Sequence, residues 1–178
     1  MRILIIRHGK VNFHWSKWCT SEEFDKECSA YDRASVKDII YKIPQTEYQD
    51  IYISTLSRSE DTAHKLFSKG RLRKTALINE VPLRSSFDTR KKMPLWFWNV
   101  SGRLQWLLNH PRQSEGCRQT RQRAGRFIEI LCKGGSDSVV VTHRFYMHTL
   151  LQEMRRAGFR MDKSQANYKN GEYVVAER

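Results

Sequence analysis

Short, mostly apolar runs predict the strands of this protein. Each run has only four or five residues, and isoleucine and valine are frequent in them, as in buried strands. A strand without regular polar positions is typical of a parallel sheet that helices cover on both faces. A later run at 172–177 follows the turn signal Asn170-Gly171, and we expect an edge strand there. The other expected strands are 3–6 (ILII), 50–54 (DIYIS), 75–79 (TALIN) and 138–142 (SVVVT).

Helical patterns lie between these runs, and the alternation of strands and helices predicts an α/β fold with a mostly parallel central sheet. Gly70, Gly134 and Gly158 stand where C-terminal helix caps are expected. The chain has no internal repeat and no linker rich in Pro, Gly or Ser, so we expect one domain over residues 1–178. The expected helices are 34–43, 58–69, about 115–133 and about 145–157.

The segment at about 81–112 does not fit this alternation. It interleaves aromatic residues, among them Trp96 and Trp106, with basic residues such as Arg90 and Arg103. We expect an irregular insertion over the carboxyl edge of the sheet, where α/β proteins bind ligands. The alternative is that the tryptophans only anchor a long loop by packing.

The composition is basic: 32 Lys and Arg stand against 19 Asp and Glu, which gives a formal net charge of +13. Such an excess attracts nucleic acids, acidic membrane surfaces or phosphorylated small molecules, and charge alone does not choose among them. Nucleic acid is disfavoured despite the basic charge, because no helix-turn-helix, RNP or zinc-finger pattern supports it.

Targeting and redox signals are also missing from the sequence. No apolar run is long enough to span a bilayer, and the N-terminus does not have the pattern of a signal peptide. The four cysteines form no CxxC pair and no metal-ligand spacing. We therefore expect a reduced, cytoplasmic compartment, no membrane partner and no metal.

Three predicted strands deliver basic side chains at their carboxyl ends. The first strand runs into Arg7-His8-Gly9, the strand at 50–54 leads to Arg58, and the strand at 138–142 runs into His143-Arg144. In an open parallel sheet these ends share one edge, so we expect the side chains to converge there. A guanidinium fork matches two phosphate oxygens, and a neutral imidazole beside it can attack phosphorus.

The start of the helix at Arg58 is expected to add to this anion site. Ser57-x-x-Glu60 fits a capping box, which predicts Ser57 as the N-cap and Arg58 as the first helical residue. The free N–H groups of the first turn would then face the same sheet edge.

Three motifs at these strand ends resemble those of the histidine phosphatase superfamily, which has the phosphoglycerate mutase-like fold. Arg7-His8-Gly9 resembles the RHG signature of the family. Residues 54–63 (STLSRSEDTA) resemble the second motif, Ser-x-Leu-x-Arg-x-x-x-Thr-Ala, and residues 140–143 (VVTH) resemble the third. The resemblance spans about residues 2–155 and implies a three-layer α/β/α sandwich with a mostly parallel sheet.

The resemblance also implies chemical roles for the matching residues. His8 would become phosphorylated, Arg7 and Arg58 would bind the phosphoryl oxygens, and His143 would stabilise the charge that develops during transfer. No metal or organic cofactor is implied. Such fixed charges accelerate transfer because they are arranged for the transition state rather than for the ester.

A general acid must protonate the leaving group if the reaction is to be fast. Glu80 lies just past the run at 75–79 and resembles the acidic position of the family in that place. Asp88 in the insertion and Glu115 in Ser114-Glu115-Gly116 are the alternatives.

The sequence departs from the family pattern at three positions. Val11 and His14 stand where the first motif often has Thr and Asn, and Arg144 follows the second histidine, where Gly is common. His14 would donate to phosphate in place of the Asn, or it is an exposed histidine in an aromatic loop. Arg144 would crowd the pocket or bind phosphate.

The expected function is therefore a metal-independent phosphatase that acts on a phosphomonoester through phosphohistidine. A mutase is less favoured, because Glu80 is followed by Val81-Pro82-Leu83 rather than by Arg-x-Tyr-Gly. The expected partner is a phosphorylated small molecule, with a phosphoprotein as the alternative substrate. The three departures motivate a second hypothesis, a domain of the same fold that binds a phospholigand without turnover.

Overall fold

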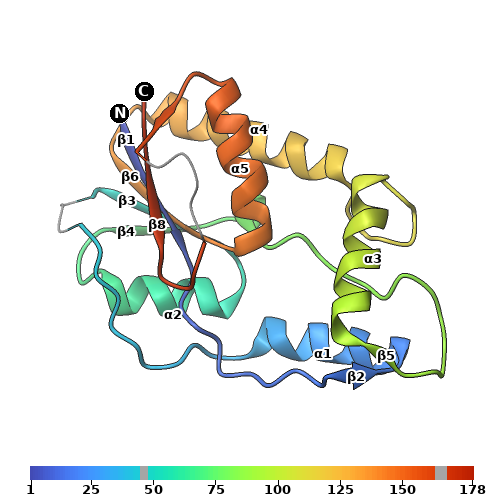
Figure 1. Ribbon diagram of the computed structural model, residues 1–178. Helices are drawn as coiled ribbons and strands as arrows, with labels where there is room; N and C mark the ends of the chain where they lie inside the picture. The colour runs from blue at the N-terminus through green and yellow to red at the C-terminus, as the bar shows by residue number, and fades with distance from the viewer. Residues whose placement is uncertain (45–47, 163–167) are drawn as a thin grey trace.

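The computed structural model describes residues 1–44, 48–162 and 168–178, and these form a six-stranded sheet with the order β4-β3-β6-β1-β8-β7 (Figure 1). The first four strands of that order run parallel to one another, whereas β8 runs antiparallel to β1 and β7 antiparallel to β8. The predicted α/β fold with a mostly parallel sheet is confirmed. The strands are β1 (Arg2–Arg7), β3 (Asp50–Ile53), β4 (Arg71–Lys74), β6 (Ser138–Thr142), β7 (Arg160–Met161) and β8 (Tyr173–Glu177).

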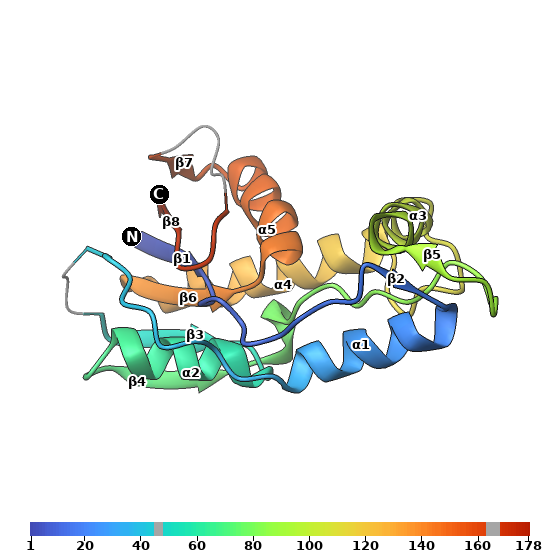
Figure 2. The ribbon, with the colours of Figure 1, turned by 60° about the horizontal axis from the view of Figure 1, so that its bottom comes forward.

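Helices cover both faces of the sheet, which makes three layers (Figure 2). Successive side chains of a strand point to opposite faces, so Ile3 and Ile5 of β1 pack in one core cluster with α4 (Cys117–Gly134) and α5 (Arg144–Arg156). Leu4 and Ile6 pack in the other cluster, with α2 (Ser57–Leu66). All four side chains are fully buried, which explains why this strand shows no polar alternation.

The helices expected at 58–69, 115–133 and 145–157 are confirmed as α2, α4 and α5, with ends that differ by a few residues. Gly158 follows α5 with a φ of 88°. The left-handed cap of α4 is Gly135 rather than Gly134, and α2 ends at Leu66 with Phe67 as its C-cap, before Gly70.

Two predicted elements are wrong. The helix expected at 34–43 is absent: this stretch has no helical residue, and Val36 forms a β-bridge with Val11. The run at 75–79 is not a strand but contains a short 3₁₀ helix, η1 (Ala76–Ile78), which Thr75 caps by accepting from the Leu77 N–H. The fourth parallel strand is instead the exposed and polar β4, whose position at the sheet edge leaves its side chains in solvent.

Two finer predictions also fail. Leu56, not Ser57, is the N-cap of α2, and the buried Ser57 hydroxyl has no hydrogen-bond partner among the described residues. Glu60 pairs with Lys74 of β4 at 2.6 Å, so it does not close a capping box. The strand at 172–177 exists as β8 but is not an edge strand, because the two-residue β7 pairs with its outer side.

The segment at 81–112 is more regular than expected, since it contains β5 (Met93–Pro94) and α3 (Leu95–Leu107). β5 pairs with β2 (Trp18–Cys19), and α1 (Ser21–Arg33) lies beside them. Trp98 of α3 is fully buried against Cys19 and Phe24, so its packing fixes this group of elements. We call α1, β2, β5 and α3 the cap; it extends beyond one end of the sheet (Figures 1 and 2).

Within the described ranges, no helix has both the length and the apolar character that crossing a membrane requires.

A substitution at Gly171 tests how tightly the turn before β8 is packed against the end of β1. Its φ is +74°, its N–H donates to the Arg7 carbonyl, and a Cβ there would lie 1.9 Å from a ring carbon of Tyr41. We expect Gly171→Ala to lower the free energy of unfolding by about 2–5 kcal/mol, from left-handed strain and overpacking together. Gly135→Ala is the control, because φ there is +64° with open space around it; it should lose only about 1–2 kcal/mol. Equal losses in urea unfolding would contradict this packing.

Candidate active site

Two buried histidines meet at the carboxyl edge of the sheet. β1 and β6 are neighbours in register, Arg7 beside Thr142, so the next residues of the two strands, His8 and His143, lie side by side. Their ring centroids are 5.0 Å apart, and their exposed fractions are 1% and 0%. The convergence predicted from the strand ends is therefore present.

The hydrogen bond of His8 to its neighbour fixes which ring nitrogen carries the proton. Nδ1 lies 2.7 Å from the Gly9 carbonyl oxygen, which can only accept, so Nδ1 is the donor. The Nε2 atom of the neutral ring then carries the free lone pair. Burial, with the nearby charge of Arg58, lowers the pKa of His8 from its ordinary 6.5 to about 3, so the ring is neutral at physiological pH.

His143 is held by two side chains of the second motif. Arg58 Nε donates to Nδ1 of His143 at 3.1 Å, so the Nε2–H of a neutral ring donates to the Ser54 hydroxyl at 2.7 Å. Burial, followed by the neighbouring His8 and Arg58, lowers the pKa of His143 well below its ordinary value. Both imidazoles thus stay uncharged beside a guanidinium that is itself only 1% exposed.

The remaining hydroxyls of the second motif tie the strand ends together. Thr62 accepts from the Gly9 N–H at 2.8 Å and donates to the Arg58 carbonyl at 2.6 Å. Ser59 donates to the Val141 carbonyl at 2.6 Å, which joins α2 to β6. The second motif therefore supplies the hydroxyl groups that hold the basic side chains in place, in addition to Arg58 itself.

A cavity of about 1040 Å³ lies between the sheet edge and the cap, and the buried rings of His8 and His143 are not among the residues that line it. Arg7 and Arg58 line it, together with Arg144, Glu80 and several cap residues. The insertion is thus placed over the carboxyl edge, as expected. Trp98 and Trp106 of this segment also pack against the protein, whereas Trp96 is exposed, so both interpretations of the segment hold for different residues. The cap residues that line the cavity, with one residue of the chain leading to it, are Trp15, Asp25, Cys28, Ser29, Tyr31, Asp32, Leu95, Asn99 and Arg103.

Arg7 and Arg144 line the cavity without an ion-pair partner among the described residues. One terminal nitrogen of Arg7 donates to the Tyr168 carbonyl, while its Nε is buried without a partner in the described part of the chain. Burial lowers the pKa of the Arg7 guanidinium. Arg144 is exposed at the first turn of α5. Both forks offer N–H groups to an anion.

Glu80 is the one of the three acid candidates that lines this cavity. Its two oxygens accept from the N–H groups of Val81, Phe145 and Tyr146 at 2.9–3.2 Å, which holds the carboxyl at the start of α5. Asp88 is 80% exposed and pairs with Arg112, which lowers its pKa.

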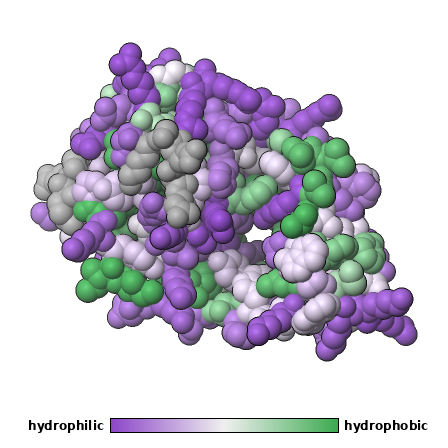
Figure 3. Space-filling model, in the orientation of Figure 1, coloured by the Kyte–Doolittle hydropathy of each residue, from purple (hydrophilic) through white to green (hydrophobic). Residues whose placement is uncertain are grey.

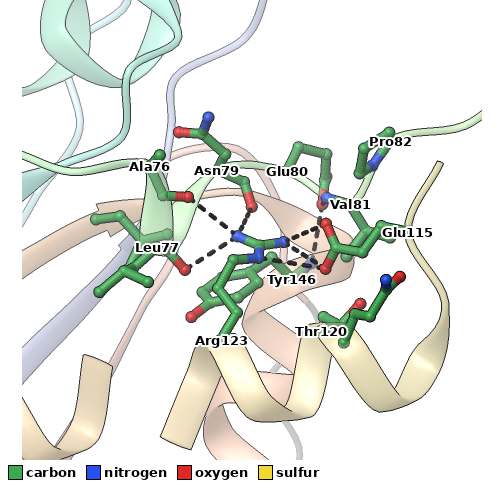
Figure 4. A network of polar contacts seen from close by, with 12 residues as sticks. Ala76, Leu77, Asn79, Glu80, Val81, Pro82, Glu115, Thr120, Arg123 and Tyr146 are labelled. Carbon is green, nitrogen blue, oxygen red and sulfur yellow. Dashed lines mark hydrogen bonds and ion pairs between the residues drawn. The ribbon is translucent and has the colours of Figure 1, made fainter. Parts of the chain in front are cut away.

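Glu115, the third candidate, faces a different place. Its carboxylate pairs with Arg123 at 2.9 Å, and the same guanidinium donates to the carbonyls of Leu77 and Asn79 (Figure 4). Glu115 lines a separate depression, together with Pro82. It is therefore tied into a structural network rather than brought to the histidines.

His14 is not brought to the other predicted residues. It is exposed on the chain between β1 and β2 and is not among the cavity-lining residues. The exposed-histidine alternative fits this position, and nothing in the contacts supports a phosphate-binding role. Trp15, its neighbour, lines the cavity instead.

Two cap residues that contact the basic groups were not predicted from the sequence. Asp32 of α1 pairs with Arg58 at 2.9 Å, and the Tyr31 ring lies 5.0 Å from the same guanidinium. The signal that could have found their helix is Thr20-x-x-Glu23, a capping box that starts α1.

Cysteine chemistry at the cavity wall is disfavoured. Burial raises the pKa of the Cys28 thiol to about 12, so it does not supply a thiolate nucleophile. Among the residues that the structure describes, no group of three or more His, Cys, Asp and Glu side chains is arranged to hold a metal ion.

The family model of the histidine phosphatase superfamily (branch 1) matches residues 3–176. The chain belongs to this family. None of the curated proteins matches it.

Solved structures share the fold at low identity. Phosphoglycerate mutase from Bacillus anthracis aligns with a TM-score of 0.59 and 17% identity, over 98% of this chain and 86% of that one. A mutant phosphoserine phosphatase from Entamoeba histolytica, in complex with phosphoserine, aligns with a TM-score of 0.57 and 16% identity, over 98% of this chain and 89% of that one. A mycobacterial glucosyl-3-phosphoglycerate phosphatase aligns with a TM-score of 0.57 and 15% identity, over 98% of this chain and 88% of that one. The family is thus established, and these likenesses support the fold alone.

The Asp32–Arg58 pair predicts competition with any anion that Arg58 binds. Asp32 accepts from an N–H that a phosphoryl oxygen would otherwise accept, so we expect Asp32→Asn to bind orthovanadate about fivefold more tightly. The measurement is titration calorimetry.

Asp25→Asn is the matched control, because Asp25 lies on the same helix and lines the same cavity but contacts Ser85 and Arg84. Its affinity should change less than about twofold, since surface ion pairs of this kind contribute little. An equal gain in both variants would mean that only the total charge matters, and weaker binding by Asp32→Asn would mean that the pair prepares Arg58 for the anion.

The buried neutral ring of His8 predicts a loss of stability in acid. Because its folded-state pKa of about 3 lies below the ordinary 6.5, only the unfolded chain takes up this proton between these values. This contribution is complete above pH 6.5 and falls by about 1.4 kcal/mol per pH unit below it. When the free energy of unfolding is measured in urea from pH 6 to pH 4, its decrease per pH unit should be smaller in His8→Gln than in the wild type by this amount. His64→Gln, at an exposed position on α2, serves as control, and an unchanged slope in His8→Gln would refute the assignment.

Proposed function

We propose that this protein is a metal-independent phosphatase that hydrolyses a phosphomonoester through a phosphohistidine on His8. The observation that carries the proposal is the Nδ1–H bond to the Gly9 carbonyl, which leaves Nε2 of a neutral ring free for attack. Arg7 and Arg58 adjoin that ring and line the cavity. Fixed guanidinium groups of this kind stabilise the negative charge on a phosphoryl group during transfer.

In the proposed first step, His8 Nε2 forms a bond to phosphorus while the bond from phosphorus to the ester oxygen breaks. Arg7, Arg58 and Arg144 bind the phosphoryl oxygens, and Glu80 gives its proton to the leaving oxygen. His143 stabilises the developing charge in this step by turning its Nε2–H from the Ser54 hydroxyl to a phosphoryl oxygen. In the second step a water attacks phosphorus, the nitrogen–phosphorus bond breaks, and Glu80 takes the proton of the water. The enzyme returns to its starting state with alcohol and phosphate released.

The substrate we propose is a phosphorylated small molecule. The cavity of about 1040 Å³ is large enough for a phosphoryl group with a body attached. The structural neighbours include a phosphoserine phosphatase and a glucosyl-3-phosphoglycerate phosphatase, which agree with this class. A phosphoprotein phosphatase and a mutase are the alternative activities. The four free cysteines agree with a cytoplasmic location, which is also part of the proposal.

The second candidate function is a domain that binds a phospholigand without turnover. One observation favours it: Arg7, Arg58 and Arg144 line the cavity, whereas His8 and His143 are not among its lining residues and are 1% and 0% exposed. Such a domain would bind phosphate or vanadate but would not release phosphate from esters.

Hydrolysis of p-nitrophenyl phosphate in EDTA, from pH 5 to 8, tests the proposed activity. We expect phosphate release by the wild type that resists chelation and falls to background in His8→Ala. His64→Ala, on the exposed side of α2, should retain full activity. Vanadate binding with no phosphate release from a panel of phosphomonoesters would favour the binding domain, and release that persists in His8→Ala would exclude the phosphohistidine route.

The role of Glu80 is tested by the leaving group. Glu80→Gln should slow hydrolysis of alkyl phosphates about 10²–10⁴-fold, because their alkoxides need a proton, and p-nitrophenyl phosphate much less. Asp88→Asn and Glu115→Gln should show no such dependence, as both lie outside the cavity. If steady-state rates of Glu80→Gln fell equally for both classes of ester, Glu80 would not be the acid.

A further inference from the structure

Exposed hydrophobic side chains gather on the cap. Eleven large hydrophobic residues are exposed among the described residues, and seven of them belong to the cap or to the loops beside it. Trp96 is 66% exposed and Leu108 is 76% exposed, values that are unusual for such side chains. We call these seven residues the apolar patch: Trp18, Phe87, Trp96, Val100, Leu104, Leu107 and Leu108.

The patch follows one side of α3. Trp96, Val100 and Leu104 are spaced by four residues, and Leu107 continues the row, so the four share a helix face. The other side of the helix faces the protein: Leu95, Asn99 and Arg103 line the cavity, and Trp98 is buried. The helix therefore presents a polar and partly covered side to the cavity and an uncovered apolar side to solvent.

The surroundings of the patch are basic. Residues 89–114 contain five Lys and Arg and no Asp or Glu. Of the five, Arg103 faces the cavity and Arg112 pairs with Asp88, which leaves three beside the patch. Arg90, Lys91 and Lys92 are exposed just before β5, and of these Lys92 lies near a carboxylate, that of Glu23. Arg118, an exposed residue at the start of α4, lies near the other end of α3, since its backbone N–H donates to the Asn109 side chain. Figure 3 shows hydrophobic side chains gathered over α3 with hydrophilic side chains around them.

This charge pattern decides between two occupants of the patch. A second copy of the chain related by a two-fold axis would bring basic ends of α3 against basic ends in either orientation, because both ends carry cations. A surface of anionic headgroups would instead attract these cations while the tryptophans and leucines enter the boundary with the acyl chains.

We propose that the apolar patch docks on the surface of a lipid bilayer that contains anionic phospholipids, with α3 lying in the plane of the interface. The expectation of no membrane partner came from the absence of a spanning run, and a helix that lies on a bilayer needs no such run. This docking does not depend on the phosphatase chemistry, because it uses the side of α3 that faces away from the cavity.

Vesicle flotation with the full chain tests the proposal. We expect binding to vesicles of phosphatidylglycerol and phosphatidylcholine at about 0.1 M salt, where screening still leaves headgroup attraction, and little binding to phosphatidylcholine alone. The double variant Trp96→Ser, Leu104→Ser should bind at least about tenfold more weakly, because two side chains no longer enter the bilayer. Both residues are exposed, so thermal unfolding should show that the variant is folded.

Ile39→Ser, Ile40→Ser is the matched control, since these side chains are exposed outside the cap, and its binding should equal that of the wild type. No binding to anionic vesicles would overturn the proposal. Equal binding by wild type and the Trp96, Leu104 variant would also overturn it, as the attraction would then be charge alone. A dimer in sedimentation equilibrium that the same variant abolishes, without vesicle binding by the wild type, would assign the patch to a second copy instead.

Discussion

The hydrogen bond from His8 Nδ1 to the Gly9 carbonyl is the contact on which the chemistry of this site depends. It selects one tautomer of a buried imidazole and so leaves the lone pair of Nε2 free in a site that Arg7 and Arg58 adjoin. Burial then keeps the ring neutral, since a third positive charge beside two guanidiniums in a dry site would be strongly disfavoured. The second motif, through Ser54 and Thr62, holds the partners of this ring in place.

The sequence was informative wherever one element alone positions a residue. His8, Arg58 and His143 follow strands that are apolar on both faces, and parallel strand ends share one edge, so their convergence was predictable. The sheet core was predictable for the same reason. At these positions the apolar strand that precedes the residue and the type of the residue itself are both visible in the sequence.

The failures of prediction have physical causes as well. β4 is polar because it lies at the sheet edge, so its pattern does not differ from that of a loop. α1 buries only Ser21 and Phe24 and shows little apolar periodicity, so neither the helix nor Asp32 was predictable from hydrophobic spacing. His14 was selected by its spacing from His8, yet the chain leaves the cavity before that residue and returns at Trp15. Contacts between distant segments decide such positions, and local patterns do not record them.

The site of phosphorylation is the most direct measurement of the central claim. The protein would be mixed briefly with a phosphoester, denatured in alkali to preserve phosphohistidine, digested and analysed by mass spectrometry and phosphorus NMR. We predict an acid-labile phosphoryl group on Nε2 of His8, because Nδ1 is engaged with the Gly9 carbonyl. A phosphoryl group on Nδ1, or on a residue other than His8, would contradict the claim, as would phosphate release with no trapped intermediate in either a rapid-quench time course or the digest.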